Sequence, residues 1–469
     1  MDKNAKALKS GVWYILANVI VRGMTLITTP VFSRLLTHEQ YGDYSNFLSW
    51  TNIAVILVSM RMDASLISAK FDYKERLNSY NRSLVSLTMV LTAGWAVAVN
   101  VFSHRFTNLF GFGRLYTNLM LVYCLFNAII NIFQINERYA YRYKKSVFVA
   151  LLVAVSTTIV SIILVVYMND KLTGRVIGGV LPVAVIGLVL LFLFFRNERS
   201  IDVHMWSYTL KICIPYIPHL LSLQVLNSVD RIMITRICGS ADNALYTIAY
   251  TCGHMVTLLM TSMNSAFAPW LGDKLNEKSY GEIKKVTKYY VLLFSGLATI
   301  MMLLAPEILL VMGGRSYLEA KYVMTPVAMG CVCQFLYTLY VNVEQFKKKT
   351  IGMAVASVLA ALLNYGLNLY FIPRYGYIAA AYTTLAGYVF LLLSHIIIIR
   401  IIGEHKTFDN RFIIGLMLVM CLVTVGVNCL YTLPLIRYIV IGIVTIVIGV
   451  FSLFRWDMIK RIMNKIIHA

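Results

Sequence analysis

The chain contains one pattern of about 200 residues written twice, and this repeat restricts its possible folds more than any other feature. Matching residues recur at a constant spacing of 202 positions. The matched pairs are Leu8 and Leu210, Lys9 and Lys211, Arg34 and Arg236, Tyr44 and Tyr246, Glu75 and Glu277, Lys145 and Lys347, and Gly174 and Gly376. One uninterrupted spacing over about 170 residues is hard to obtain from chance matches between apolar segments. The sequence therefore predicts two copies of one structural unit.

Apolar segments long enough to cross a membrane follow one another along the whole chain. Hydrophobic residues form 59% of the 469 positions and charged residues only 13%, which is about half the charged fraction of an ordinary soluble protein. A run of roughly 20 apolar residues is sufficient to cross a hydrocarbon core of about 30 Å. Such runs occupy 11–33, 43–66, 83–104, 115–137, 147–168 and 174–195 in the first copy, 211–236, 243–270, 287–312, 322–345, 350–372 and 376–402 in the second, and 411–431 and 435–455 beyond it. The sequence predicts an all-α membrane protein with 14 transmembrane helices.

Six spans in each copy predict a parallel repeat, because an even number of crossings returns the chain to the side where it started. The expected divisions are an N-terminal six-helix lobe at 1–195, a cytoplasmic linker at 196–210, a second six-helix lobe at 211–402, and a part at 403–469 with two extra transmembrane helices and a basic cytoplasmic tail. Two lobes that face each other are expected to leave a cleft through the bilayer. That arrangement suggests transport.

The distribution of positive charge predicts the orientation. With the N-terminus in the cytoplasm, 29 of the 42 Lys and Arg residues lie on the inner side, 10 lie in outer loops and three lie inside spans. A nearly threefold excess in short loops places both termini in the cytoplasm by the positive-inside rule. The net charge of +21 then belongs largely to the inner face, beside anionic lipid headgroups. The basic residues are divided among eight separate segments, so a nucleic-acid-binding domain is not expected.

The loops are too short to hold a catalytic domain. The longest inner segments, 67–82, 196–210 and 271–286, each have room for one short amphipathic helix that lies at the membrane interface. The chain lacks a glycine-rich phosphate loop that ends in Lys-Ser or Lys-Thr, and its outer loops carry no cluster of catalytic side chains. Cys331 and Cys333 fall on opposite sides of a helix, and the cysteines suggest neither a disulfide framework nor a metal site. We expect no enzymatic activity and no cofactor.

Three arginines inside spans are the strongest candidates for a binding function: Arg22, Arg61 and Arg231. A guanidinium at the bilayer centre costs about 2.5–3.5 kcal/mol on insertion scales, so it is expected to face protein or water rather than lipid. Arg61 is expected near the inner surface, Arg22 in the middle and Arg231 near the outer surface. A structural role stays open for two of them, because Asp63 lies near Arg61 and Asp230 lies next to Arg231.

Polar residues accompany these arginines at helical spacing. The expected substrate-binding set, in addition to the three arginines, consists of Asn18, Thr25, Gln224, Asn227, Asp230, Asn127, Asn131 and Gln134. Asn18, Arg22 and Thr25 share one helical face, and Gln224 and Asn227 occupy the positions equivalent to Arg22 and Thr25 in the second copy. Many inward-facing amides suit hydroxyl-rich ligands such as sugars, and Asn364 and Asn368 add two more. The alternative is that the amides only join helices.

Histidines and prolines leave two further hypotheses open. His219, His254 and His395 lie in spans, where they could relay protons or simply pack against neighbouring helices. Pro215 and Pro218 open the first span of the second copy and predict a kink there, which could act as a hinge.

Three stretches of the sequence resemble a known family. They are Asn227-Ser-Val-Asp230-Arg231-Ile-Met-Ile with Gly239 and Ala244-Leu-Tyr246-Thr-Ile-Ala249-Tyr250, then Thr29-Pro-Val-Phe-Ser-Arg34-Leu-Leu-Thr37 with Glu39-Gln-Tyr41-Gly42-Asp-Tyr44, and Pro373-Arg-Tyr-Gly376-Tyr-Ile-Ala-Ala-Ala381. These stretches resemble the polysaccharide exporters, specifically the O-antigen and capsule repeat-unit flippases of the multidrug/oligosaccharidyl-lipid/polysaccharide exporter superfamily. The resemblance covers residues 1 to about 402, and the two helices beyond are an extension found in only some members.

The resemblance implies movement of an undecaprenyl-diphosphate-linked oligosaccharide from the cytoplasmic to the outer leaflet of the bacterial cytoplasmic membrane. Its implied partners are this lipid-linked oligosaccharide, membrane lipids, and a glycan polymerase and other polysaccharide-assembly proteins. Arg22 and Arg231 would contact the diphosphate or acidic sugars, and Arg61 would make the first contact near the cytoplasm. Two alternatives stay open: a cation-coupled drug or metabolite antiporter of the same superfamily, and a scaffold for membrane-bound glycan enzymes. The scarcity of acidic residues inside the spans favours an anionic cargo.

Overall fold

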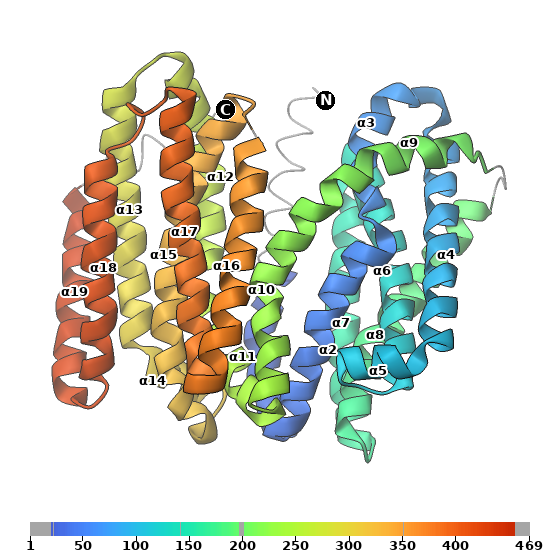
Figure 1. Ribbon diagram of the computed structural model, residues 1–469, viewed down its shortest axis with the longest axis horizontal. Helices are drawn as coiled ribbons and strands as arrows, with labels where there is room; N and C mark the ends of the chain where they lie inside the picture. The colour runs from blue at the N-terminus through green and yellow to red at the C-terminus, as the bar shows by residue number, and fades with distance from the viewer. Residues whose placement is uncertain (1–19, 22, 141, 197–200, 350, 455–469) are drawn as a thin grey trace. The chain divides into compact units, whose positions relative to one another are not determined.

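The protein is built from α-helices arranged in two compact units. The computed structural model describes residues 20–21, 23–140, 142–196, 201–349 and 351–454. The units are Met1–Ala244 and Leu245–Ala469. Each unit is a helical bundle (Figure 1), and no β-strand occurs in the part of the chain that the structure describes. The predicted all-α fold is confirmed.

Unit 1 holds the first set of helices. They are α2 (His38–Ser59), η1 (Met62–Ser65), α3 (Leu66–Asp72), η2 (Lys74–Arg76), α4 (Leu77–Val101), α5 (Ser103–Phe110), α6 (Arg114–Tyr139), α7 (Tyr143–Tyr167), α8 (Lys171–Phe195), α9 (His204–Cys213), η3 (Ile214–Tyr216) and α10 (Ile217–Ile237). Residues 23–35, ahead of α2, are also helical. Helix α11 (Ser240–His254) begins in unit 1 and continues into unit 2.

Unit 2 contains the remaining helices. They are α12 (Thr257–Asn276), α13 (Tyr280–Leu303), α14 (Ala305–Met312), η4 (Arg315–Ala320), α15 (Lys321–Phe346), α16 (Ile351–Tyr375), α17 (Tyr377–Ile402), α18 (Asn410–Leu430) and α19 (Pro434–Phe454). Helix α15 lies at the centre of this bundle, where it packs against α12, α13, α17 and α18. Most of its residues are buried.

The lengths of the helices make the protein a multi-pass membrane protein. Among the described residues, nine helices are long and apolar enough to cross a membrane, or up to eleven if each of two bent pairs counts as one span. The predicted number of 14 is therefore not confirmed. Several predicted spans are interrupted in the structure. The helix in 43–66 breaks after Ser59, that in 243–270 breaks between His254 and Thr257, and that in 287–312 breaks at Leu304.

The division into units places one segment differently from the repeat. The repeat starts its second lobe at residue 211, whereas unit 1 extends to Ala244 and includes both α9 and α10. The reason is local packing: α10 lies against α2, and α9 lies against α4. The lobe boundaries at 1–195 and 211–402 mark equivalent stretches of sequence, and the division of the structure into these lobes stays a prediction.

Short polar groups fix the start of α2. Thr37 caps the helix through a reciprocal pair of bonds, in which Gln40 N donates to Thr37 Oγ1 at 3.2 Å and Thr37 N donates to Gln40 Oε1 at 3.1 Å. This capping box satisfies backbone N–H groups that lack a partner inside the helix. It therefore defines where α2 begins.

The beginning of α2 also touches the beginning of α11 very closely. A Cβ atom built on Gly42 would lie 1.7 Å from the carbonyl oxygen of Ser240, so no residue other than glycine fits there without a shift of the backbone. Asn243 Nδ2 donates to Gly42 O at 2.9 Å, and the Ser240 hydroxyl donates to Asp43. Gly42 and Asn243 are 201 residues apart, so corresponding segments of the two sequence copies meet at this contact.

A hydrogen-bonded cluster ties α9 to the end of unit 1 where α3 and η2 lie. Tyr80 Oη bonds to Ser65 Oγ at 2.7 Å and to Thr209 Oγ1 at 2.8 Å. Arg76 and Asp202 form an ion pair at 2.9 Å. These contacts join two of the inner segments that the sequence predicts to be amphipathic, namely 67–82 and 196–210.

The last two helices are fastened to unit 2 by polar contacts at their connection. Tyr431 Oη donates to Met302 O at 2.7 Å, at the end of α13. Thr325 Oγ1 donates to Asn428 Oδ1 at 2.9 Å, and Arg437 at the start of α19 pairs with Glu307 of α14. Helices α18 and α19 are thus an integral part of unit 2.

Candidate substrate-binding site

Three of the predicted site residues, Asn18, Arg22 and Thr25, precede α2. Asn18 and Arg22 fall outside the described residues, so their predicted roles stay predictions. Thr25 lies in the helical stretch 23–35 and is exposed. It is therefore accessible, as a cavity-lining or lipid-facing residue must be.

Four predicted site residues lie on α10. Gln224 Nε2 donates to Ser228 Oγ at 2.6 Å, Asn227 Nδ2 donates to Leu223 O at 2.8 Å, and Arg231 Nη1 donates to Asn227 O at 2.9 Å. These bonds run along one helix and hold the polar side chains parallel to its axis. Gln224, Asn227 and Arg231 are half-buried, whereas Asp230 is buried with 2% of its surface exposed. Of the four predicted site residues on α10, three are therefore accessible and one, a carboxylate, is enclosed.

The prolines before α10 produce the predicted kink. Pro215 lies in η3 and Pro218 lies in the first turn of α10, and the chain bends by 53° between His204–Tyr216 and Leu220–Ile237. Proline removes a backbone donor and clashes with the preceding turn, so two of them force the bend. The bend is confirmed, and the predicted hinge motion stays a prediction.

Arg61 lies at a helix break rather than inside a continuous span, which corrects the sequence prediction. Met60 and Arg61 adopt left-handed backbone conformations with φ of 47° and 48°, and the chain bends by 49° between α2 and the following helical segment. Two successive left-handed residues end the helical hydrogen-bond ladder. Such strain in residues other than glycine is typical of functional sites.

The guanidinium of Arg61 is paired. Its Nη2 lies 3.0 Å from Asp63 Oδ2, and the two side chains are 40% and 7% exposed. The structural ion pair considered as an alternative is thus present. Because Arg61 is still substantially exposed while Asp63 is not, Arg61 combines a local structural role with an accessible positive charge.

Three amides on α6 differ from those on α10 and α16, whose side chains are hydrogen-bonded. Asn127, Asn131 and Gln134 are half-buried and follow one another at spacings of four and three residues, so they share one helical face. None of the three side chains forms a hydrogen bond with another described residue. An amide on a membrane-spanning helix without a protein partner requires water or a ligand. These three side chains are the best-placed hydrogen-bonding groups of the predicted set.

The amides of α16 have the opposite role, which corrects the idea that they line a cavity. Asn364 and Asn368 are both 0% exposed. Asn364 Nδ2 donates to Thr384 Oγ1 of α17 at 3.3 Å, and the Thr383 hydroxyl of α17 donates to Asn368. Their hydrogen-bonding capacity joins α16 to α17, so they are interhelical contacts.

The elements that carry the predicted residues are neighbours around α2. Both α6 and α10 pack against α2, and Arg61 lies two residues after Ser59, the last residue of that helix. Unit 1 thus gathers two guanidinium groups and a row of amides on elements that share one central helix. Guanidinium groups bind phosphate and carboxylate oxygens, and amides bind hydroxyl groups. The combination suits an anionic, hydroxyl-rich ligand.

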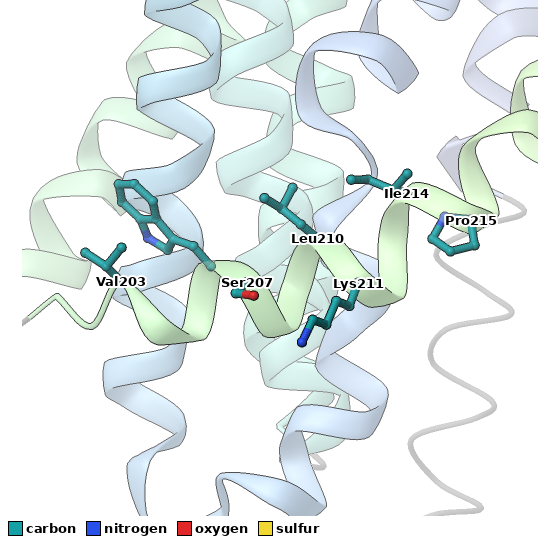
Figure 2. Close-up of a pocket in the computed structure, with 7 residues that line it drawn as sticks. Val203, Ser207, Leu210, Lys211, Ile214 and Pro215 are labelled. Carbon is teal, nitrogen blue, oxygen red and sulfur yellow. The ribbon is translucent and has the colours of Figure 1, made fainter.

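An apolar groove runs along the outer face of α9 (Figure 2). It has a volume of about 460 Å³ and is lined by Val203, Trp206, Ser207, Leu210, Lys211, Ile214 and Pro215. The opposite face of α9 packs into unit 1 through Met205, Thr209 and Cys213, each 1% exposed. Helix α9 therefore has a buried face and an accessible apolar face edged by one positive charge, as an interfacial helix requires.

One polar pair in unit 2 was not foreseen from the sequence. Glu344 of α15 and His395 of α17 are 2.7 Å apart and almost completely buried. The sequence identifies each as an ionisable residue in a span, but 51 residues separate them and nothing in the spacing predicts their contact.

The sequence is similar to two protein families and to individual known proteins. Residues 7–275 match the model of the family described as polysaccharide biosynthesis protein, and residues 215–370 match the MatE family model. Among curated proteins, the chain is similar to Lsg locus putative protein 1 of Haemophilus influenzae, with 22% identity over 76% of this chain and 89% of that protein. An uncharacterized membrane protein of the same organism is 20% identical over the same shares.

Solved structures share the fold. The lipid II flippase MurJ in an inward closed conformation superposes with a TM-score of 0.71 and 15% identity, over 95% of this chain and 99% of that chain. An inward-facing multidrug resistance MATE family transporter of the MOP superfamily superposes with a TM-score of 0.58 and 14% identity, over 83% of this chain and 99% of that chain. The similar proteins are polysaccharide-biosynthesis proteins, flippases and transporters rather than enzymes. Because the family match covers more than half of the chain, this multi-pass membrane protein belongs to the polysaccharide biosynthesis protein family and has the fold of the MOP-superfamily flippases and transporters.

Proposed function

We propose that the protein is a flippase that moves undecaprenyl-diphosphate-linked oligosaccharide repeat units of an O-antigen, capsule or exopolysaccharide. Transfer proceeds by alternating access, from the inner to the outer leaflet of the bacterial cytoplasmic membrane, with both termini in the cytoplasm. The observation that carries the proposal is the row of Asn127, Asn131 and Gln134 on α6, whose amides form no hydrogen bond with another described residue. Family membership and the accessible guanidinium of Arg61 support it.

The chemistry of the cargo assigns roles to the polar residues. The oligosaccharide would hydrogen-bond to the α6 amides and to Gln224, Asn227 and Thr25, because amide and hydroxyl groups exchange hydrogen bonds with sugars as they do with water. The diphosphate would pair with Arg61 near the cytoplasm and with Arg231 and Arg22 further along. Asp230 and Asn18 complete the proposed set, and the polyprenyl tail would stay in lipid throughout.

The groove on α9 suits the hydrocarbon of the inner leaflet. Its walls are mostly apolar, and Lys211 at its edge would lie beside anionic headgroups. In this proposal α9 rests on the inner surface of the membrane and holds the break after α2 at that depth. A glycan polymerase and other assembly proteins are further proposed partners.

A cation-coupled drug or metabolite antiporter is the second candidate. The MatE match over residues 215–370 favours it, as does the buried carboxylate of Glu344 in a spanning helix. The two candidates differ in what accumulates when the protein is missing, because only a flippase leaves lipid-linked repeat units in the membrane.

The test combines deletion with a substitution on α6. Deletion of the gene in its host is expected to accumulate lipid-linked repeat units and to stop surface glycan production. Asn127→Leu/Asn131→Leu should lower glycan export about tenfold or more, because two hydrogen bonds of about 0.5–1.5 kcal/mol each are lost. Val122→Leu on the same helix, at an exposed apolar position, is the matched control and should export normally.

One result would oppose the flippase, and another would oppose the proposed binding site. A deletion strain with normal surface glycan and no accumulated lipid-linked intermediate contradicts the proposed cargo. An α6 double variant that is present at the normal level and exports normally removes these amides from the site.

A further inference from the structure

An apolar cavity lies inside unit 1, between α2, α4, α5 and α6. Its volume is about 160 Å³, and an engineered apolar cavity of about 150 Å³ in another protein is large enough to bind benzene. The side chains that line the cavity are apolar, apart from the indole N–H groups of Trp50 and Trp95 and the sulfur of Met120. A buried water molecule needs about two to four polar partners, so these walls do not suit water. They suit a hydrocarbon group.

The wall formed by α5 is held in place by contacts with two other helices. Helix α5 is the short helix between α4 and α6 (Figure 1). Asn46 Nδ2 of α2 donates to Phe110 O at 3.0 Å, and Arg236 of α10 donates to Leu109 O. The Phe110 ring packs edge-on against the Trp50 ring at 4.9 Å. These contacts hold α5 beside α2 and keep the space between the two helices open.

One polar group at the cavity lacks a partner. The indole N–H of Trp50 is buried and forms no hydrogen bond with a described residue. An unpaired donor in apolar surroundings costs free energy, so it is expected to meet an acceptor. A ligand of this cavity should therefore carry an oxygen acceptor next to its hydrocarbon.

The rim of the cavity carries a positive charge. Leu109, which lines the cavity, is 45% exposed, and Arg105 lies one helical turn before it on the same face of α5. Arg105 is exposed, and its guanidinium lies 5.8 Å from the centre of the Phe102 ring and forms no ion pair with a described carboxylate. Guanidinium groups bind phosphate oxygens. Helix α5 thus combines a face toward the cavity with an accessible cation, as a helix at a membrane interface does.

We propose that this cavity binds the glycerol end of one phospholipid acyl chain. The first carbons of the chain occupy the cavity, the Trp50 N–H donates to the ester carbonyl, and Arg105 pairs with the phosphate. Ile53 and Leu57 are half-buried and follow Trp50 on one face of α2, where the rest of the chain leaves toward the surrounding lipid. This site does not depend on the proposed transport function.

Two features favour a phospholipid over the polyprenyl tail of the proposed cargo. A polyprenyl chain has no carbonyl that could accept the Trp50 N–H. Tryptophan is also enriched at the depth of the lipid headgroups, and two of the six tryptophans of the chain line this cavity. Ester carbonyls lie close to that depth.

Native mass spectrometry of the full-length protein in detergent tests the site. With added phosphatidylglycerol, the wild-type protein should bind one molecule more than Ala54→Leu, because leucine at this buried wall position fills the space that the chain needs. Ala93→Leu, the same enlargement at an exposed position of α4, is the matched control and should bind as the wild type does. Equal binding by folded Ala54→Leu and the wild type overturns the site.

A second variant tests the hydrogen bond and keeps the experiment decisive if Ala54→Leu does not fold. Trp50→Phe keeps an aromatic ring in the wall but removes the N–H. It should bind phosphatidylglycerol about fivefold more weakly than the wild type, whereas an ether-linked analogue, which has no carbonyl, should bind to both proteins equally. If Trp50→Phe lowers the affinity for both lipids alike, or for neither, the contact with the carbonyl is overturned.

Two further measurements test the phosphate contact and the identity of the ligand. Arg105→Gln should weaken the binding of phosphatidylglycerol and leave that of diacylglycerol, which has no phosphate, unchanged. Equal weakening for both lipids overturns the role of Arg105. Undecaprenyl phosphate at the same concentration should leave phosphatidylglycerol bound to the wild type. Its displacement, to the same extent in the wild type and in Trp50→Phe, would assign the cavity to a polyprenyl chain and overturn the phospholipid site.

Discussion

Arg61 combines several roles in one residue. The side chain compensates the buried Asp63, yet 40% of its surface is accessible. Its backbone is left-handed, like that of Met60, which caps α2, so Arg61 is also part of the break after that helix. A substitution at position 61 therefore changes the backbone, the ion pair and the accessible charge together.

A pair of variants distinguishes the ion pair from a cargo contact. Asparagine tolerates left-handed backbone, so Arg61→Asn should cost about 1–2 kcal/mol mainly by leaving Asp63 without its partner, with the partial exposure of Arg61 limiting the loss. Arg61→Asn/Asp63→Asn removes both charges and should recover most of the melting temperature. If Arg61 binds the diphosphate, both variants export about tenfold less glycan or lower still. Recovery of export in the double variant would show that Arg61 is only structural.

The sequence shows which polar residues lie in apolar helices, but it does not show whether each one is available to a ligand or joins two helices. Asn131 on α6 and Asn368 on α16 look alike as amides in apolar helices. Asn131 forms no hydrogen bond with another described residue, whereas Asn368 lies against Thr383. Spacing along one helix identifies a face, but it does not identify the neighbouring helix, and that neighbour decides whether an amide is available. The same limitation hid the contact between Glu344 and His395.

At the level of helices, the apolar runs predicted where segments would lie but not where they would break. The spans 115–137 and 174–195 fall within α6 and α8, and the span 147–168 ends one residue beyond α7. The break at Met60 and Arg61 carries neither proline nor glycine, so its left-handed geometry depends on contacts that spacing does not reveal. They are the local Arg61–Asp63 pair and the Cys213 thiol, which donates to Arg61 O from a distant part of the chain. The kink before α10 was predictable because Pro215 and Pro218 impose it chemically.

The start of α8 offers a test of helix capping. Asp170 Oδ1 accepts hydrogen bonds from Leu172 N at 3.0 Å and Thr173 N at 3.2 Å, and the Thr173 hydroxyl donates to Oδ2 at 2.5 Å. The Thr173 hydroxyl is the main reason that the pKa of Asp170 is lowered. Asp170→Ala should therefore destabilise the protein by about 1 kcal/mol, measured by thermal or denaturant unfolding in detergent.

The pH dependence of this effect has a definite sign. Because the folded pKa of Asp170 lies below its unfolded value, its stabilisation is present above about pH 4 and is lost as the pH falls through the folded pKa. The difference between wild type and Asp170→Ala should shrink in that acidic range. Asp170→Asn keeps an acceptor for the backbone N–H groups and should show a smaller loss at neutral pH. Equal stability of all three proteins would contradict the capping role.

At the level of the whole molecule, the repeat and the hydrophobicity established the class of protein, and the family match agrees with it. The compact units follow packing rather than the repeat, because α9 and α10 lie against helices of unit 1. A sequence repeat records equivalent pieces of chain and contains no information about which piece each helix packs against. The helices beyond the repeat are a further case, since only the structure shows how they join unit 2.

Removal of α18 and α19 should destabilise unit 2. Truncation after residue 402 leaves the Met302 carbonyl, Thr325 and Glu307 without the partners supplied by Tyr431, Asn428 and Arg437. We expect a lower melting temperature in detergent and less protein in the membrane. Truncation after residue 454, which keeps α19, is the control. A protein cut at 402 that melts at the wild-type temperature would show that the two helices are dispensable for stability.

The pairing of Glu307 with Arg437 also has a consequence during synthesis. The two residues are 130 positions apart, so Glu307 leaves the ribosome long before its counterion has been translated. Until α19 is inserted, α14 carries an acidic group at the edge of the bundle with nothing to neutralise it. Insertion of the α18–α19 hairpin thus supplies the counterion of Glu307, and a stalled nascent chain that ends before residue 437 would present this acidic group to membrane chaperones and proteases.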